Sequence, residues 1–286
     1  MHVVTTGSGI GRIEGATVAL LDTPYPDAGA VIEHTGSLEP LAECAVRARI
    51  AMDGAKLLSP LTRPRAVWGV GLNYRSKAER TGRVVPTDPI LYLGAPSAVV
   101  APNSAVTIPA EQTVEMDYEG EIAVVIGQRL YRASADDVWP CVAGITAAND
   151  ITARDIMRST SAPTLAKSFP GFSPLGASLC TLDEFDDCDC IGIRTWVNGQ
   201  LCQDDSSAGM IFAIPDLLAR ISWFAALEPG DVVLTGTPAG TGQDRQCFLA
   251  AGDEIRVEVG PVMPLVTTVA AVGHEPTRPV LAQYGA

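Results

Sequence analysis

Four acidic residues recur at every second position between residues 115 and 121. They are Glu115, Asp117, Glu119 and Glu121, and they run directly into an apolar segment at residues 122–126. If this stretch is one β-strand, its two-residue side-chain period places all four carboxylates on one face, where like charges repel each other. A solvated acidic face on an edge strand would tolerate them. The apolar continuation, however, is typical of a strand buried on both faces, so the inner carboxylates should approach the interior and need a cation.

A hard divalent ion would satisfy buried carboxylates of this kind. Mg2+ is the first candidate, because it prefers oxygen ligands and keeps water or substrate oxygens in its shell, and Mn2+ or Ca2+ could replace it. A third acid at the end of another strand would complete the site. Asp150 follows the apolar run at residues 142–145 and offers such a ligand. Taken alone, Asp150 is equally typical of a turn or a helix cap.

Other motifs give weaker signals. The segment Gly7-Ser-Gly9-Ile-Gly11 lacks both the spacing and the strand-to-helix setting of a dinucleotide-binding loop. The turn at residues 235–242 lacks the Lys-Ser/Thr of a phosphate-binding loop, and its Thr hydroxyls and amides would instead meet a substrate carboxylate. No serine has a nucleophile-elbow pattern, so a serine hydrolase triad is not expected.

Composition excludes several classes of function. Of the 286 residues 47% are hydrophobic and 19% charged, which excludes intrinsic disorder. Asp and Glu number 33 against 20 Lys and Arg, and a net charge of −13 repels nucleic acid and anionic lipid. No apolar run approaches the roughly 20 residues of a membrane span, and the first residues lack the features of a signal peptide. The seven cysteines lack zinc-finger spacing. A soluble, cytoplasmic protein is therefore expected.

Short apolar runs bounded by turn residues predict a chain that is mostly β. Strands are expected at residues 66–70, 90–93, 122–126, 142–145, 191–197, 232–235 and 255–259. Helices are expected at residues 38–58, 134–139 and 215–227, the second with Ser134 and Asp137 spaced as a capping box. Proline breakers after residue 58 mark a boundary, giving a small N-terminal domain at residues 1–62 and a main domain at residues 63–286. The fold class predicted is α+β, rich in β.

Several motifs now assemble in one order along residues 60–275. In this order the chain resembles the fumarylacetoacetate hydrolase family. The motifs are Val70-Gly-Leu-Asn-Tyr74, Asp117-Tyr-Glu-Gly-Glu121, Asn149-Asp-Ile-Thr-Ala-Arg-Asp155, Lys167-Ser-Phe169, Pro174-Leu-Gly176, Val197-Asn-Gly199, Gln203, Pro229-Gly-Asp231 and Thr235-Gly-Thr-Pro-Ala-Gly240.

The resemblance implies a fold and a set of site residues. The fold is a core of rolled mixed sheets with a smaller N-terminal domain, in a protein that is usually a homodimer. The divalent ion would bind Glu119, Glu121 and Asp150. The resemblance implies that Lys167, Gln203 and Thr237 line the substrate pocket. Tyr74 and Arg154, which stand in matched motifs, are further candidates for substrate binding, and Lys77 and Lys167 are the candidate catalytic residues.

The resemblance also implies a chemistry. Members of this family act on 2-oxo acids or 1,3-dicarbonyl compounds, and their hydrolyses, decarboxylations, tautomerisations and dehydrations share an enolate. A metal that chelates two substrate oxygens stabilises the enolate charge, and an ammonium group such as that of Lys167 offsets a carboxylate or oxyanion.

One segment departs from the family pattern. Family hydrolases and decarboxylases usually read Asn-Tyr-x-x-His-x-x-Glu, with the His and Glu forming a dyad on a lid. Here Lys77 takes the His position and Arg80 the Glu position, with Glu79 one residue early. Gly94 and Pro170 likewise stand where the family often has Lys and Asp. Simple hydrolysis with a histidine base is therefore not expected.

Three explanations account for the departure. Lys77 could act as the base, because burial beside other cations lowers a lysine pKa. The reaction could be a proton shift, decarboxylation or cyclisation that needs no activated water. The site could also be a remnant in a non-catalytic binding protein. We predict a metal-dependent enzyme that enolises a 2-oxo or 1,3-dicarbonyl acid for a lyase or isomerase step, with C–C hydrolysis of an acylpyruvate or acylacetoacetate and non-catalytic binding as alternatives.

Overall fold

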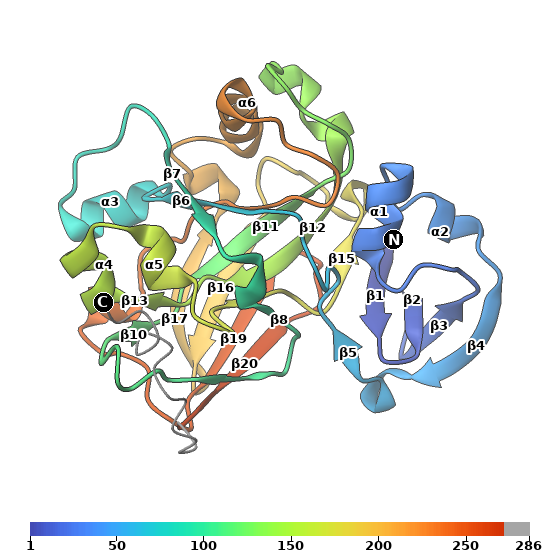
Figure 1. The fold of residues 1–286 in the computed structure, drawn as a ribbon, viewed down its shortest axis with the longest axis horizontal. Coiled ribbons are helices and arrows are strands. Elements are labelled where there is room, and N and C mark those ends of the chain that lie inside the picture. Colours follow the sequence, from blue (N-terminus) through green and yellow to red (C-terminus); the bar gives the residue numbers. More distant parts are fainter. Residues whose placement is uncertain (272–286) are drawn as a thin grey trace, which may run out of the picture.

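The central strand of the molecule is β11 (Gly120–Ile126), which is buried along its whole length (Figure 1). The structure is a computed structural model that describes residues 1–271. Ile122, Val124 and Ile126 belong to one apolar core, and Ala123 and Val125 belong to another. Because successive side chains of a strand point to opposite faces, β11 is covered on both sides. This is the burial that its continuous apolar sequence predicts.

The main sheet has eleven strands within the described part of the chain and places β11 next to β12 and β18. Adjacent strands are antiparallel, except that β18 and β6 run parallel. Strand β5 (Leu57–Leu58) pairs with β1 off the main path. The order along the sheet is β4 (Val46–Ala51), β3 (Thr17–Leu21), β2 (Gly9–Glu14), β1 (His2–Thr6), β15 (Leu179–Cys180), β12 (Val142–Asn149), β11, β18 (Val232–Leu234), β6 (Val67–Gly71) and β7 (Ile90–Gly94).

A second sheet packs on the Ile122 face of β11. Its order is β17 (Gln200–Ser206), β16 (Gly192–Val197), β19 (Glu254–Val259), β20 (Leu265–Ala270) and β9 (Ala105–Thr107). Ile193 and Val257 from this sheet share a core with Ile122. Two short ladders join β10 (Met116–Asp117) to β13 (Thr152–Ala153), and β14 (Ser173–Pro174) to β8 (Val99–Val100). The predicted α+β, β-rich class is confirmed, and so are the seven predicted strands.

The N-terminal segment contributes to the core on the other face of β11. Val3, Leu21 and Ile32 lie in one apolar core with Ala123 and Val125. Strand β1 pairs with β15, so the main sheet continues from the N-terminal segment into the rest of the chain. The division at residue 62 stays a prediction.

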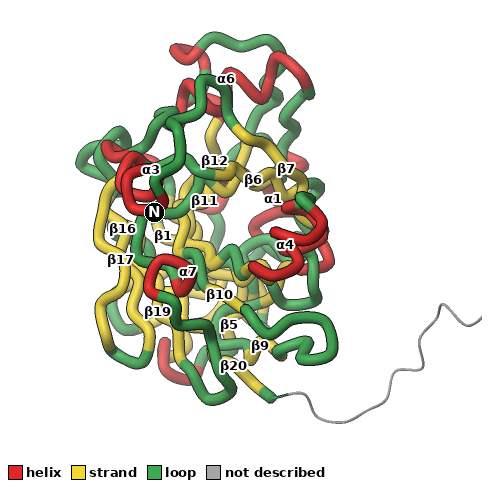
Figure 2. Tube along the Cα trace, turned by 90° about the vertical axis from the view of Figure 1, so that its left-hand side faces the viewer, coloured by secondary structure: helices red, strands yellow, loops and turns green. Residues whose placement is uncertain are grey.

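The helices are short and lie around the sheets. Figure 1 shows α3, α4 and α5 on one side of the molecule and α6 at one end. Figure 2, which faces that side, shows α3 and α4 apart from each other and α6 again at the end. No helix within residues 1–271 is long and apolar enough to cross a bilayer. The helices are α1 (Ala28–Thr35), α2 (Pro40–Glu43), α3 (Arg75–Thr81), α4 (Arg154–Thr160), α5 (Pro163–Lys167), α6 (Ile214–Phe224) and α7 (Gly242–Arg245), and the 3-10 turns are Met52–Gly54, Pro96–Ala98, Ala135–Asp137, Trp139–Cys141, Leu182–Glu184 and Ser207–Gly209.

The predicted helix at residues 38–58 is wrong. That segment holds only the single turn α2, followed by β4, a 3-10 turn and β5. Val46, Ala48 and Ile50 alternate with Arg47 and Arg49, and this two-residue period suits pairing with β3 better than a helical face.

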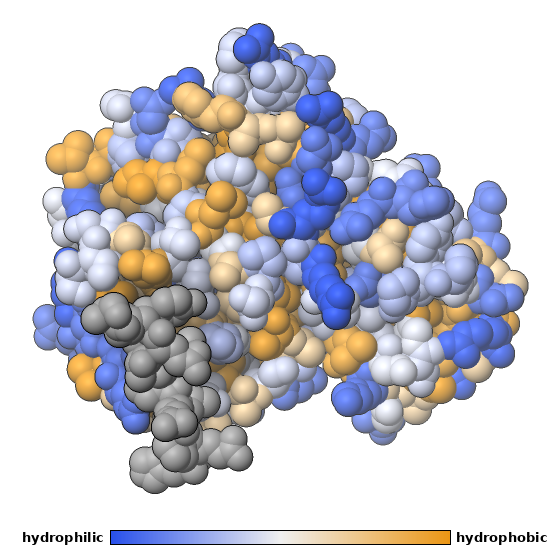
Figure 3. Space-filling view, in the orientation of Figure 1, coloured by the Kyte–Doolittle hydropathy of each residue, from blue (hydrophilic) through white to orange (hydrophobic). Residues whose placement is uncertain are grey.

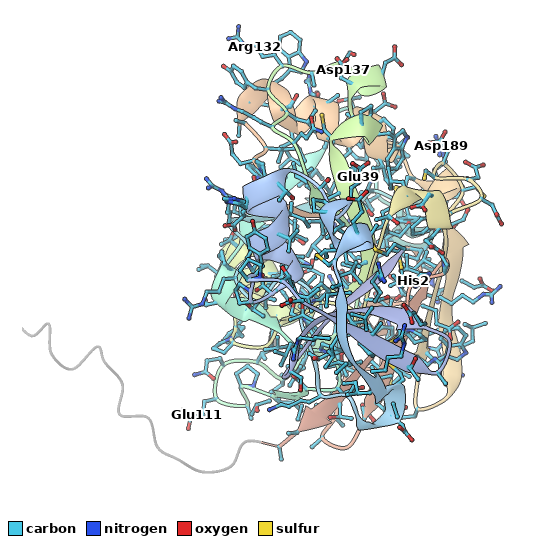
Figure 4. The ribbon with its side chains drawn as sticks, turned by 90° about the vertical axis from the view of Figure 1, so that its right-hand side faces the viewer. His2, Glu39, Glu111, Arg132, Asp137 and Asp189 are labelled. Carbon is cyan, nitrogen blue, oxygen red and sulfur yellow. The ribbon has the colours of Figure 1, made fainter. Side chains whose placement is uncertain are left out.

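The predicted helix at residues 134–139 is partly correct. The capping box is present, since the amide and hydroxyl of Ser134 both donate to Asp137 Oδ2, at 3.0 and 2.6 Å. The segment nevertheless forms two 3-10 turns, because Pro140 follows at once and cannot continue a regular helix. Asp137 and Arg132 lie at the end of the molecule near α6 (Figure 4). The predicted helix at residues 215–227 is confirmed as α6, with Pro215 in its first turn.

Candidate active site

The acidic ladder is broken where the chain passes from β10 to β11. Tyr118 and Glu119 lie between the two strands, so the four carboxylates do not share one strand face. Glu115 forms an exposed pair with Arg158 at 2.7 Å. The buried Asp117 accepts hydrogen bonds from Arg154 Nε at 2.7 Å and from two backbone amides of α7, Gly242 and Gln243. The single acidic face considered from the sequence is therefore wrong, and only Glu119 and Glu121 turn towards Asp150.

Glu119, Glu121 and Asp150 form a buried cluster of three carboxylates. One oxygen of each lies within 4.8 Å of the others. Pairing of β11 with β12 sets this geometry, since Gly120 lies opposite Asn149 and the Asp150 amide donates to the Glu119 carbonyl at 2.8 Å. Two adjacent antiparallel strands thus bring the three acids together from positions thirty residues apart in sequence.

Two buried cations neutralise part of this cluster. Lys167, the last residue of α5, donates through Nζ to Glu119 Oε2 at 2.6 Å, to Asp150 Oδ2 at 2.5 Å and to Thr152 Oγ1 at 2.7 Å. Arg154, the first residue of α4, bridges Asp117 and Glu119. Four buried carboxylates therefore face two cations.

The surplus of negative charge shows in the pKa values. Burial raises the pKa of Glu121, and the neighbouring charges of Asp150 and Glu119 raise it further. Burial also raises the pKa of Asp150, although Lys167 opposes the shift. Burial acts the same way on Glu119, but Arg154 and Lys167 overcome it and lower its pKa to about 2.

This donor set fits a divalent cation. Glu121 Oε1 and Asp150 Oδ1 receive no hydrogen bond from residues 1–271. The other oxygen of Glu121 accepts from the Gly236 amide at 2.7 Å, and the other oxygen of Asp150 accepts from Lys167. Oxygen ligands with excess negative charge are the environment that Mg2+ and Mn2+ prefer. The three acids predicted as ligands thus share a site that could hold such an ion.

Lys77 lies on α3 and is buried, with its side chain 8% exposed. Its Nζ donates to Thr241 Oγ1 at 2.6 Å and to Asp244 Oδ2 at 2.7 Å. Burial lowers the pKa of Lys77 and the charge of Arg154 adds to this effect, whereas Glu119 and Asp244 oppose it. The partner of Lys77 is therefore an acid far away in sequence, not the nearby Glu79.

A cavity of about 320 Å3 lies beside the carboxylate cluster; Glu119 and Glu121 line it, and Asp150 is not among its lining residues. Figure 3 shows hydrophobic residues over the side of the molecule that carries α3 and β7. Ile90 of β7 is 46% exposed and lines the cavity. The lining includes Lys77, Tyr92, Glu119, Glu121, Arg154, Lys167 and Thr237.

Two predicted substrate-binding residues lie outside this lining. The Tyr74 side chain is fully buried and its hydroxyl has no hydrogen-bond partner among residues 1–271. Gln203 donates to Thr237 Oγ1 at 2.8 Å and accepts from the Gly120 amide at 3.0 Å. Thr237 in turn donates to the Gly120 carbonyl at 2.8 Å. Gln203 therefore supports the wall that carries Thr237.

Histidine does not contribute to the cavity in the described part of the chain. His2 lies among the N-terminal strands (Figure 4), where its ring nitrogens are 3.2 Å from Glu184 and from Cys180. Within residues 1–271, the absence of histidine from the sequence motifs therefore extends to the residues that line the cavity.

Three residues of the site have no counterpart in the residues chosen from the sequence. Asp244 is readable in part, because Thr241 and Asp244 have capping-box spacing and form that box at the start of α7. Asp117 belongs to a matched motif, but its partners depend on the fold. Tyr92 gives no signal beyond its place in an apolar strand.

Comparison with known proteins identifies the relatives of this chain. The family model of the fumarylacetoacetate (FAA) hydrolase C-terminal domain matches residues 66–270. Oxaloacetate tautomerase Fahd2a, mitochondrial, of Rattus norvegicus is 40% identical over 215 residues, which cover 74% of this chain and 68% of that protein. The corresponding Xenopus laevis tautomerase, fahd2, is 34% identical over 83% of this chain and 84% of its own length.

Solved structures agree with this assignment. A fumarylacetoacetate hydrolase from the psychrophilic Exiguobacterium antarcticum superposes with a TM-score of 0.83 at 31% identity, covering 95% of this chain and 100% of that one. A 5-carboxymethyl-2-hydroxymuconate delta-isomerase from Mycobacterium smegmatis has a TM-score of 0.78 at 26% identity, with the same coverage. The chain belongs to the fumarylacetoacetate hydrolase family.

Proposed function

We propose that this chain is a divalent-metal-dependent tautomerase that interconverts the keto and enol forms of oxaloacetate or a similar small 2-oxo acid. The observation that carries the proposal is the buried carboxylate cluster, which shares one cavity with a lysine of lowered pKa and with no histidine of residues 1–271. Relatives named as tautomerases and isomerases support a proton shift over other outcomes of enolisation.

Glu119, Glu121 and Asp150 would hold the ion, with Mg2+ as the first candidate and Mn2+ or Ca2+ as substitutes. When bound, it would supply Lewis-acid stabilisation of the negative charge that develops on the substrate oxygens during enolisation. The protein residues supply orientation and proton transfer.

Lys167 acts as a fixed positive charge. Burial lowers its pKa, but Asp150 and Glu119 more than compensate, so its pKa is raised overall. An ammonium group that stays protonated suits binding of a substrate carboxylate or oxyanion and does not suit a base. Thr237 and Arg154 line the same cavity and orient the substrate.

Lys77 carries the proton. In its neutral form, the amine accepts a proton from the carbon next to the ketone, which breaks the C–H bond and leaves an enolate and an ammonium ion. The ammonium then donates this proton to the enolate oxygen, forming the O–H bond of the enol and regenerating the amine. A base of lowered pKa is what this step needs near neutral pH.

Deuterium exchange tests the proposal. The C3 protons of oxaloacetate are followed by NMR in deuterated water with Mg2+, using wild type, Lys77→Met and a protein-free control. Wild type should accelerate exchange, and Lys77→Met should lower the rate by about 10²- to 10⁴-fold, the usual contribution of a general base. Lys56→Met is the matched control, because Lys56 is exposed and is the only lysine besides Lys77 and Lys167.

The result also separates the alternatives. If wild type gives no exchange above the protein-free rate with any 2-oxo acid, the hypothesis of a non-catalytic binding protein replaces that of an enzyme. C–C hydrolysis is recognised by oxygen-18 water, since only attack by water on the C–C bond labels a product carboxylate.

We also propose that the protein is a homodimer and that it is located in the cytoplasm. The dimer is the usual assembly implied by the family resemblance, and light scattering on purified protein tests it by mass. The relatives named above are mitochondrial, so fractionation of the producing cells tests the location.

A further inference from the structure

The Tyr92 ring occupies a position that is available only because residue 69 is glycine. Tyr92 lies on β7 directly opposite Gly69 of β6. A Cβ atom on Gly69 would stand 2.0 Å from the Tyr92 ring. The phenol ring therefore lies flat across Gly69, and the pairing of two strands fixes its place at the cavity wall.

The Tyr92 hydroxyl meets the carboxylate cluster. It donates to Asp150 Oδ2, the oxygen that also accepts from Lys167 Nζ. Lys167 Nζ lies 5.2 Å from the centre of the Tyr92 ring, within the range of a cation–π contact. Oδ2 is thus committed to two donors, and Oδ1 receives none from the described part of the chain.

We propose that Tyr92 is a positioning residue of the metal site, which holds Asp150 by Oδ2 and leaves Oδ1 for the divalent cation. This rests on the proposed function, since it assumes that Asp150 is a ligand. Hydrogen bonds to the outer atoms of ligating groups fix their orientation, and their loss typically weakens metal affinity about 10- to 100-fold.

The Tyr92 hydroxyl is the donor in this contact, because the carboxylate oxygen that it meets can only accept. The ring and the hydroxyl of Tyr92 have separate tasks, because the ring covers Gly69 and the hydroxyl binds Asp150.

Metal titration separates these tasks. Isothermal titration of metal-stripped protein with Mn2+ compares wild type with Tyr92→Phe, which keeps the ring and removes the hydroxyl. We expect the affinity to fall about tenfold. Tyr131→Phe is the matched control, because Tyr131 is 51% exposed and lies outside the cavity lining.

A second pair of variants tests the position of the Tyr92 ring without removing the Tyr92 hydroxyl. Gly69→Ala should displace the ring and weaken Mn2+ binding, whereas Gly94→Ala should leave it unchanged, because the nearest atoms to a Cβ on Gly94 lie 3.7 Å away. Thermal unfolding of each variant confirms that it is folded.

The outcomes are distinct. Wild-type protein that binds no Mn2+ would overturn the proposed function. Wild type that binds Mn2+ with unchanged affinity in Tyr92→Phe would overturn the role of Tyr92 alone.

Discussion

Lys77 stands where the family motif usually has histidine, and the structure pairs it with Asp244 from α7. The carboxylate holds the ammonium in place, while burial and Arg154 favour the neutral amine. A lysine so balanced can change protonation state without leaving its hydrogen bonds. Lys77 and Asp244 thus form a buried ion pair between two segments that are distant in sequence.

Asp244→Asn should move the pH dependence of the reaction. Removing the carboxylate charge removes an interaction that favours the Lys77 ammonium, so the pKa of Lys77 falls. The rise of kcat/KM with pH, which reports formation of the amine, should then shift to lower pH by about one unit, equivalent to about 1.4 kcal/mol.

Asp136→Asn serves as the control, because Asp136 is exposed and has no contact with the cavity lining. A profile for Asp244→Asn that keeps its position while only its height changes would show that Asp244 does not tune Lys77.

Glu121 is predicted to destabilise the metal-free protein near neutral pH. Its pKa is raised on folding, so the folded state binds the proton more tightly than the unfolded state does. Its contribution to stability is therefore present at low pH and is lost as the pH rises through the folded-state pKa.

In EDTA at pH 7.5, Glu121→Gln should accordingly melt above wild type, by roughly 2–4 °C for each kcal/mol regained. The difference should vanish near pH 4, below the unfolded pKa of glutamate. Glu111→Gln is the control, since Glu111 lies on the surface (Figure 4). A lower melting temperature for Glu121→Gln at pH 7.5 would contradict the charge surplus.

At the scale of elements, the strands were predictable and the short helices were not. The apolar runs at β11, β12 and β18 signal burial directly. Helices α3, α4 and α5 are five to seven residues long and owe their stability to packing and ion pairs, so local sequence carries little trace of them. The three acids of the buried cluster were predicted from the spacing of the acidic segment and from the collinear family motifs. Asp244 and Tyr92 were not, because only the pairing of distant segments brings them to the cavity.

Asp117 joins three elements. It accepts from the backbone of α7, from Arg154 of α4 and from the Tyr118 amide next to β10. Asp117→Asn leaves the buried Arg154 with one charged partner, and breaking a buried pair typically costs about 3–5 kcal/mol.

We expect a comparable loss in the free energy of unfolding, measured with urea. Asp216→Asn on the exposed face of α6 should change it by less than about 0.5 kcal/mol. An Asp117→Asn variant as stable as wild type would show that α7 is held by other contacts.

At the scale of the whole molecule, one sheet extends from the N-terminal strands to β7. The N-terminal segment also contributes to one of the two cores that cover β11. The proposed division at residue 62 would therefore separate units that share a sheet and a core. The prolines after residue 58 correctly predicted a turn region at this position. They indicate where the chain changes direction, but they carry no information about which surfaces a segment covers.

A fragment of residues 63–286 should consequently fail to pack. The fragment lacks the N-terminal part of the core that contains Ala123, Val125 and Leu179, and these residues are fully buried in the described structure. The fragment is expected to bind the dye ANS and to lose near-ultraviolet circular dichroism, as loosely packed states do. Native-like spectra without dye binding would show that residues 63–286 fold independently.

The excess of buried carboxylates has a consequence for engineering. A sequence optimised only to stabilise this backbone would replace Glu121 or Asp150 with a neutral residue, because the fold gains when like charges are removed. Such a redesign would remove the proposed metal site while the stability of the fold increased. Local conflicts of this kind mark positions where selection acts on something other than the fold. In this family member, they are the positions that a designer should hold constant.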